Sequence, residues 1–221
     1  MKYFLDTANL SEIRDAFETG VIAGVTTNPS LLSKEPKANF YEHIKNIAAL
    51  CEANGSVPLS VEVFAKEASE MFRQALEIRE KIGYDNLNIK IPVGYEELKV
   101  IHKLATEKVA VNCTCCFTDV QMQMATQAGA RYVSLFYNRL IDAGGNPNVV
   151  LSNTRRFLDS NRLHCEIIAG SIRNPYDLNA AWNSGAHIVT AGHNILTKTP
   201  QHLKTDESVE GFLNDFAKWM D

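Results

Sequence analysis

Short apolar segments alternate with longer stretches of helical period along this chain, and that alternation limits the folds it can adopt. Eight segments are short enough to be strands, and each is followed by residues whose apolar positions recur at helical spacing. They recur about every 27 residues: KYFLD, AGVTTNP, PLSVEV, LNIKIP, VAVNCT, YVSLF, CEIIAGS and AHIVTA. Eight strands that each precede a helix predict an α/β fold, a parallel sheet closed into a (β/α)8 TIM barrel.

The alternative to a barrel is a doubly wound open sheet. Such a sheet would need fewer strands and a first turn of the type G-x-G-x-x-G, whereas the first turn here is DTANLSE. No internal linker or low-complexity tract divides the chain, so we predict a single domain over residues 1–221. The segment GGNPN, from Gly144 to Asn148, is expected to be a long βα loop.

Two helices can be described in more detail. Asn9 is expected to cap the first helix, and the helix after VAVNCT holds Val120, Met124 and Ala128 as its apolar positions.

A ninth helix over residues 206–221 has no place in a complete barrel. It carries an apolar stripe that consists of Val209, Phe212, Phe216 and Trp219. The stripe could pack on the edge of its own barrel, but we expect it to pack on a neighbouring subunit.

Composition excludes several classes of protein. The 221 residues are 45% hydrophobic and 22% charged with a net charge of −4, which is typical of a soluble globular protein. No apolar run approaches the roughly 20 residues of a membrane span, and Asp6 interrupts the only apolar stretch near the start. Blocks of Lys and Arg are absent, which argues against nucleic acid as a main partner. The odd number of cysteines, five, favours a reducing compartment, so we expect a cytoplasmic protein.

The segment CTCCF places Cys113, Cys115 and Cys116 within four positions. A C-x-C-C pattern without a second cysteine or histidine pair is a weak zinc signal. Cys115 and Cys116 should also point in different directions if the segment is a strand. We therefore interpret the three thiols as packing residues and expect no metal site.

Lys90 lies in an otherwise apolar strand, NLNIKIPV. Burial there would favour the neutral amine, which is a nucleophile. Alternatively, Lys90 could reach solvent at the strand end or merely pair with a carboxylate such as Glu62.

Nearly every predicted strand ends in a polar or ionisable side chain, and in a parallel barrel these ends meet at one mouth. Each residue has another explanation, since Asp and Asn often cap helices and Thr often ends strands. Together, one lysine, two carboxylates, two amides and several hydroxyls suit carbonyl chemistry through a Schiff base. The set comprises Asp6, Asn28, Glu62, Lys90, Asn112, Thr114, Ser134, Ser171 and Arg173.

The sequence resembles the small transaldolase and fructose-6-phosphate aldolase family. The resemblance covers the whole chain and is carried, in order, by DTAN, GVTTNPSLL, SVEV, KIPV, NCT, YVSLFYNRL and GSIRNP. It implies a class I aldolase-type barrel that needs no cofactor or metal. It also implies a homo-oligomer, a pentamer or a decamer of two stacked pentamers, in which the last helix reaches a neighbouring subunit.

The resemblance implies a role for each catalytic residue. Lys90 would form the Schiff base with the C2 ketone of a ketose phosphate. Asp6 would take the proton of the C4 hydroxyl as the C3–C4 bond breaks. Glu62 and Thr114 would hold the water that moves protons as the imine forms.

The resemblance also implies the substrate contacts. The three-carbon unit would be bound by Asn28, Asn112 and Ser134, and the terminal anion by Arg139, Ser171 and Arg173. Guanidinium groups have a geometry that suits such an anion, which could be a phosphate or a sulfonate.

Two positions separate the branches of this family. The aldolase branch typically has Gln and Tyr where this chain has Glu62 and Phe136, so both residues favour transfer to an aldehyde over release of dihydroxyacetone. The segments LFYNR and GSIRN depart from the family pattern around the anion end, where relatives often have Pro-Phe-x-Gly-Arg and an Ala at Gly170. A 6-deoxy-6-sulfofructose transaldolase and a fructose-6-phosphate aldolase are therefore alternatives. A noncatalytic sugar-phosphate-binding barrel would be favoured if Lys90 or Asp6 were missing, and both are present.

Overall fold

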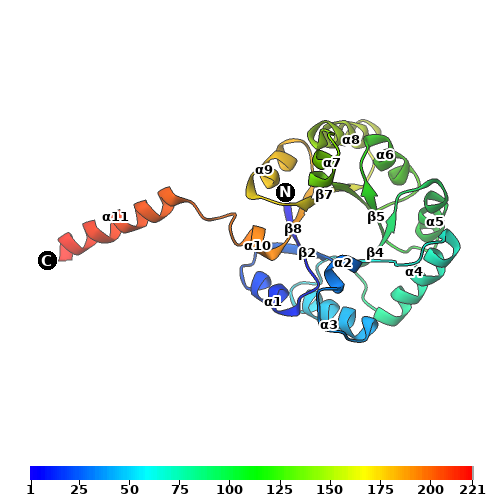
Figure 1. Cartoon of the computed structure of the whole chain (residues 1–221), viewed down its shortest axis with the longest axis horizontal. Coiled ribbons are helices and arrows are strands. Elements are labelled where there is room, and N and C mark those ends of the chain that lie inside the picture. The colour runs from blue at the N-terminus through cyan, green and yellow to red at the C-terminus, as the bar shows by residue number, and fades with distance from the viewer. Residues whose placement is uncertain (221) are drawn as a thin grey trace.

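The computed structural model describes residues 1–220 and contains one closed parallel barrel (Figure 1). Each strand pairs with the next along the chain, and the last pairs with the first. The predicted TIM barrel is therefore confirmed. Its strands are β1 (Lys2–Asp6), β2 (Ile22–Thr26), β3 (Leu59–Glu62), β4 (Leu87–Pro92), β5 (Val111–Cys116), β6 (Tyr132–Phe136), β7 (Glu166–Ile172) and β8 (Ile188–Ala191).

Helices surround the barrel, and apolar faces join them to the strands. As predicted, Asn9 caps the first helix, its side chain accepting the N–H groups of Ser11 and Glu12. The helices are α1 (Leu10–Glu18), α2 (Pro29–Leu32), α3 (Phe40–Ala53), α4 (Ala68–Ile82), α5 (Tyr95–Thr106), α6 (Asp119–Gln127), α7 (Tyr137–Asp142), α8 (Pro147–Asn161), α9 (Pro175–Asn183), α10 (His193–Leu196) and α11 (Leu203–Met220).

The segment from Gly144 to Asn148 is not a long loop, and that prediction was wrong. Residues 143–146 form a tight turn between α7 and α8, and Pro147 and Asn148 already belong to α8. Gly144 has a φ of 79° in this turn, a conformation that glycine adopts without a steric penalty. Asn146 caps α8, and Pro147 is the first helical residue, where its missing N–H costs no hydrogen bond.

The predicted apolar face of α6 was wrong for Val120 and Met124, although the helix itself is present and Ala128, at its end, packs against the core. Val120 is 57% exposed and Met124 is 46% exposed, whereas Met122 and Ala125 are fully buried. A capping box between Thr118 and Gln121 begins the helix, and its buried residues are Met122, Ala125 and Thr126.

Strands β5 and β7 are irregular near their carboxyl ends. The pairing shifts between Cys113 and Cys116 in β5 and between Ala169 and Ile172 in β7. Each irregularity contains a non-glycine residue with left-handed backbone, Cys115 at a φ of 59° and Ser171 at 60°. Such bulges redirect side chains and are frequent next to active sites.

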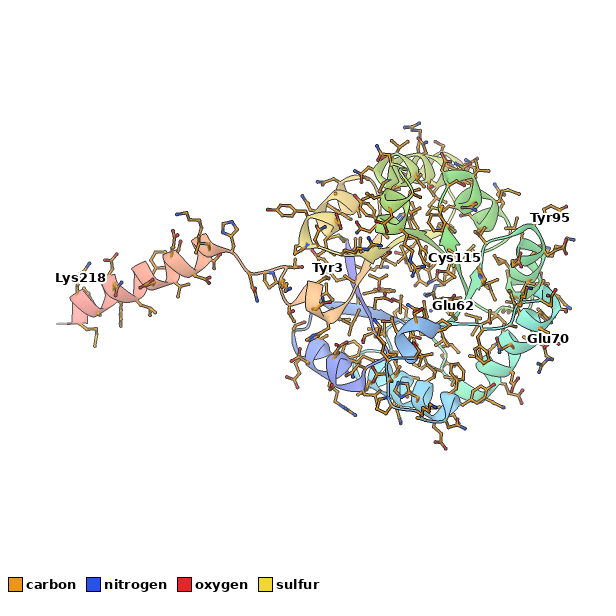
Figure 2. All side chains as sticks on the ribbon, in the orientation of Figure 1. Tyr3, Glu62, Glu70, Tyr95, Cys115 and Lys218 are labelled. Carbon is orange, nitrogen blue, oxygen red and sulfur yellow. The ribbon has the colours of Figure 1, made fainter. Side chains whose placement is uncertain are left out.

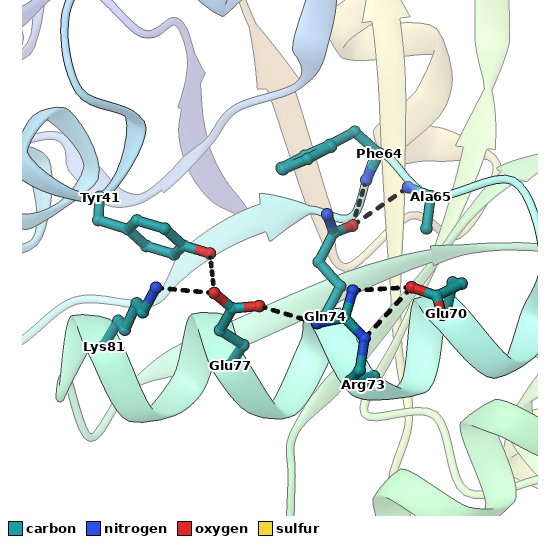
Figure 3. Close-up of polar contacts among 8 residues, drawn as sticks. All are labelled: Tyr41, Phe64, Ala65, Glu70, Arg73, Gln74, Glu77 and Lys81. Carbon is teal, nitrogen blue, oxygen red and sulfur yellow. Dashed lines mark hydrogen bonds and ion pairs between the residues drawn. The ribbon is translucent and has the colours of Figure 1, made fainter.

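A side chain of α4 fixes the loop that follows β3 (Figure 3). Gln74 Oε1 accepts the backbone N–H groups of Phe64 at 2.7 Å and Ala65 at 3.1 Å. These residues lie two and three positions after Glu62, so the amide holds the chain just beyond the point where β3 delivers its last side chain to the barrel mouth.

Helix α11 extends away from the barrel (Figure 1) and begins at Leu203, three residues before the predicted start at 206. All of its described residues are exposed. The exposed apolar side chains include Phe212 at 72% and Trp219 at 77%, so the apolar stripe does not cover the barrel of its own chain. No helix within residues 1–220 is long and apolar enough to cross a bilayer.

Candidate active site

A cavity of about 200 Å³ lies where the barrel strands end. It brings together all the predicted site residues except Arg173. Figure 2 labels two of the side chains that line it, Glu62 and Cys115. The lining residues are Asp6, Thr26, Asn28, Pro29, Ser30, Glu62, Lys90, Asn112, Thr114, Cys115, Ser134, Phe136, Arg139, Gly170, Ser171 and Thr190.

Lys90 is 6% exposed and its amine is held by two oxygens. Nζ donates to the carbonyl of Thr27 at 2.9 Å and lies 3.1 Å from Glu62 Oε2. Glu62 and Lys90 are register partners on β3 and β4, which explains the contact. The lysine is thus both buried and paired with a carboxylate, and that carboxylate is a group to which the ammonium could lose its proton.

Asp6 is held by a short chain of hydroxyl groups. Thr26 Oγ1 donates to Asp6 Oδ1 at 2.7 Å and lies 2.6 Å from Thr190 Oγ1. Because the single hydroxyl proton of Thr26 is used for Asp6, Thr190 is the donor to Thr26. Burial raises the pKa of Asp6 above 3.8, although the charge of Lys90 and the hydrogen bond of Thr26 oppose this rise. A carboxylate with a raised pKa is a better proton acceptor.

A second chain of hydrogen bonds fixes Asn112. Ser134 Oγ donates to Asn112 Oδ1 at 2.6 Å, and Asn112 Nδ2 donates to Ser60 Oγ at 3.2 Å. Both ends of the amide are therefore bound, so its orientation in the cavity is fixed. Ser60 lies below the cavity and was not predicted.

Thr114 supplies a polar atom without a partner. Its Oγ1 is buried and makes no hydrogen bond within residues 1–220, although the residue lines the cavity. A buried hydroxyl normally has a partner, so this atom is suited to bind water or a substrate oxygen. Asn28 combines a cavity position with a structural role, since its side chain caps α2.

The far side of the cavity carries a guanidinium group above an aromatic ring. Arg139 lies 4.7 Å from the ring centroid of Phe136, which packs edge-on against Phe117 at 5.8 Å. Ser171, at the bulge of β7, lines the same cavity.

Arg173 is not in the cavity lining. Its guanidinium forms a bidentate pair with Asp142, with distances of 2.8 Å to Oδ1 and 2.6 Å to Oδ2. Both side chains are about half exposed, at 52% and 55%.

Cys115 and Cys116 have different surroundings, as expected, but the interpretation of all three thiols as packing residues was wrong for Cys115. Cys115 lines the cavity, where burial and the nearby Glu62 carboxylate raise the pKa of its thiol. Cys113 and Cys116 are buried behind the strand, with their sulfur atoms 3.9 Å apart. Within the described part of the chain, no group of three His, Cys, Asp or Glu side chains could hold a metal ion. Cys115 was not predicted to reach the cavity, because only the bulge turns it inward.

Comparison with known proteins agrees with this geometry. The model of the Transaldolase/Fructose-6-phosphate aldolase family matches residues 3–220. The chain belongs to this family. A probable transaldolase 2 of Listeria monocytogenes is 40% identical, over 98% of this chain and 96% of the relative. Probable transaldolases of Halalkalibacterium halodurans and Geobacillus kaustophilus are each 39% identical, over 98% and 99% of this chain and 99% of each relative. The transaldolase/fructose-6-phosphate aldolase match extends through α11.

Proposed function

We propose that the protein transfers a dihydroxyacetone unit from a ketose 6-phosphate to an aldose phosphate such as glyceraldehyde 3-phosphate, through a Schiff base on Lys90. The observation that carries this proposal is the position of Lys90, which is 6% exposed and 3.1 Å from a carboxylate. Among the described residues that line the cavity, Lys90 is the one lysine. The reaction needs no cofactor. We place it in the cytoplasm, in keeping with five free cysteines.

In the first half-reaction, the Lys90 amine adds to the C2 ketone and the carbinolamine loses water to give an iminium. Asp6 then takes the proton of the C4 hydroxyl, the C3–C4 bond breaks, and its electrons form an enamine on Lys90. An aldehyde leaves. The raised pKa of Asp6 supports this role, because the proton is transferred to a carboxylate that is partly desolvated.

Water must also be activated while the imine forms and hydrolyses. Glu62 and the unpartnered hydroxyl of Thr114 line the same cavity as the amine. We infer that they hold this water between them and that Glu62 exchanges the proton. Asn112 and Ser134, whose orientations are fixed by hydrogen bonds, would bind the hydroxyls of the three-carbon unit.

The terminal anion would be bound at the side of the cavity that carries Arg139 and Ser171. A guanidinium and a hydroxyl suit either a phosphate or a sulfonate. The Asn28 side chain would contact the three-carbon unit from the opposite side.

In the second half-reaction, the enamine attacks an aldehyde acceptor, and Asp6 returns its proton to the new alkoxide. The competing outcome is protonation of the enamine and release of dihydroxyacetone. A phenol next to the enamine could order the water that donates this proton, whereas the ring of Phe136 cannot. We therefore expect Phe136→Tyr to increase release relative to transfer; an unchanged ratio would count against this use of position 136.

The decisive assay supplies donors and acceptors separately and together. Fructose 6-phosphate, sedoheptulose 7-phosphate and 6-deoxy-6-sulfofructose serve as donors, with glyceraldehyde 3-phosphate and erythrose 4-phosphate as acceptors. We expect a new ketose only when a donor meets an acceptor other than the aldehyde that it releases itself, as when fructose 6-phosphate is supplied with erythrose 4-phosphate. Fructose 6-phosphate with glyceraldehyde 3-phosphate would only re-form the donor. Free dihydroxyacetone at the same rate without an acceptor would instead identify an aldolase, and the preferred donor would distinguish phosphate from sulfonate.

We also propose that the protein works as a homo-oligomer, a pentamer or a decamer, in which α11 packs on a neighbouring subunit. The exposed apolar stripe supports this, because residues 1–220 leave Phe212 72% and Trp219 77% exposed. Ending the chain at residue 202 should reduce the assembly to smaller species in sedimentation velocity. Sedimentation like that of the full chain would refute this role of α11.

A further inference from the structure

Arg173 and Asp142 sit at the margin of the cavity on two different elements. Arg173 follows the cavity-lining Ser171 by two residues, and Asp142 lies one helical turn after the cavity-lining Arg139 on α7. The bidentate pair therefore joins the residue that follows β7 to the last residue of α7, and neither side chain lines the cavity. Arg173 holds the pKa of Asp142 below its usual value, so the pair is charged at neutral pH.

The pair changes the number of positive charges that a substrate meets. Among the described residues that line the cavity, the cationic side chains are Lys90 and Arg139. Lys90 is at the reacting end and is paired with Glu62. Arg139 is thus the one lining cation for a terminal anion, while the charge of Arg173 is neutralised by Asp142.

We propose that Asp142 is a specificity-determining residue that competes with the terminal anion of the substrate for Arg173. A monoanion, such as a sulfonate, is matched in charge by Arg139 alone. A phosphate monoester is a dianion at neutral pH, and a second guanidinium is recruited to it only when Arg173 exchanges Asp142 for the phosphate. The inference rests on the proposed function for its substrates, but the anion exchange itself does not depend on catalysis.

The exposure of the pair makes this exchange feasible. An ion pair in which both side chains are half exposed contributes little stability, because water solvates each partner when they separate. Separating Asp142 from Arg173 therefore costs little free energy, and a dianion offsets that cost more readily than a monoanion because it attracts the guanidinium more strongly.

Asp142→Asn tests the proposal, because it removes the competing charge and keeps the size of the side chain. The ratio of KM for fructose 6-phosphate to KM for uncharged fructose should fall by about two- to five-fold, and the ratio for 6-deoxy-6-sulfofructose should fall less. Asp159→Asn is the control, since it weakens another exposed ion pair, in which Arg155 Nε on α8 lies 3.0 and 2.9 Å from the two carboxylate oxygens of Asp159. In an Arg173→Ala background, Asp142→Asn should have no further effect. Equal changes for all three sugars, or an effect that persists without Arg173, would overturn the proposal.

A binding measurement separates this proposal from the proposed function. Inorganic phosphate and methanesulfonate are titrated into the full chain by calorimetry at a pH where phosphate is mainly a dianion. Tighter phosphate binding by Asp142→Asn, with a smaller change for methanesulfonate, supports the exchange even if no sugar is turned over. Unchanged phosphate binding in a variant that still transfers dihydroxyacetone would refute the exchange and leave the proposed function intact.

Discussion

Ser60 is expected to support the candidate active site without entering it. Its Oγ accepts Asn112 Nδ2 at 3.2 Å, and both residues have 0% exposure. Ser60→Ala removes this acceptor at almost no change in volume. It leaves a buried N–H of Asn112 without its acceptor.

The size of the effect follows from where water can enter. An unpaired polar group in a buried position costs about 1–3 kcal/mol. Ser60 is not among the described residues that line the cavity, so we expect no water to replace its hydroxyl in the variant. Ser134→Ala breaks the shorter bond to Asn112, 2.6 Å, but Ser134 lines the cavity, where water can replace the hydroxyl. We therefore expect Ser134→Ala to cost about 1 kcal/mol or less in stability, so the longer hydrogen bond should be the more important one.

Thermal denaturation at one fixed protein concentration measures this difference, because Tm of an oligomer depends on concentration. For a chain of this length, each kcal/mol lowers Tm by about 2–4 °C. Ser152→Ala, which removes an exposed hydroxyl, is the control. Ser60→Ala should also lower kcat/KM, since the Asn112 amide is then free to reorient. A Tm equal to that of the control, or a larger loss for Ser134→Ala, would refute the reasoning.

Two further predictions concern packing and pH. A Cβ at Gly24 would lie 2.5 Å from Phe4 Cζ, whereas one at Gly170 would lie 3.4 Å from Thr190 Cγ2. Gly24→Ala should therefore lower the free energy of unfolding by about 1–3 kcal/mol. Gly170→Ala should lower it by less than about 1 kcal/mol. Urea denaturation compares them, and equal midpoints would contradict the prediction. His187 Nδ1 accepts the N–H of Ile167 at 2.9 Å, and burial lowers the pKa of His187 below 6.5. Below pH 6.5 the unfolded chain therefore binds more protons than the folded one, so the free energy of unfolding should fall as the pH drops through 6.5 towards the folded-state pKa. His187→Asn, whose amide oxygen can accept the same N–H, should lose less stability over this range, and parallel pH profiles would argue against the effect.

The barrel and most of the cavity could be predicted from the sequence because both depend on local patterns. Alternating apolar segments and helical stretches fix the strand count, and parallel strands bring their carboxyl ends to one mouth. Asp6 and Glu62 end their strands and Lys90 lies two residues before the end of β4, so their meeting at the mouth required no knowledge of side-chain packing. Thr26 and Thr190 also line the cavity but were missed, since their contact joins residues 164 positions apart inside the barrel.

Other features depend on geometry that the sequence pattern does not contain. The register shift in β5 turns Cys115 into the cavity, and no periodic pattern marks such a bulge. Arg173 was predicted to line the site because it follows Ser171, but Asp142, more than thirty positions away, binds it outside the cavity. The buried side of α6 holds Met122 and Ala125 rather than Val120 and Met124, and both pairs have helical spacing, so spacing alone did not distinguish them.

Trapping of the Schiff base tests the central claim most directly. The full chain is treated with borohydride with and without fructose 6-phosphate, and intact mass and peptide mapping locate any reduced adduct. We expect one adduct, formed only with the sugar, on the peptide that contains Lys90. It should be lost in Lys90→Met and retained in Lys34→Met, a control in which an exposed lysine is removed. An adduct on any other lysine, or none with any ketose phosphate, would contradict the assignment of Lys90 as the nucleophile.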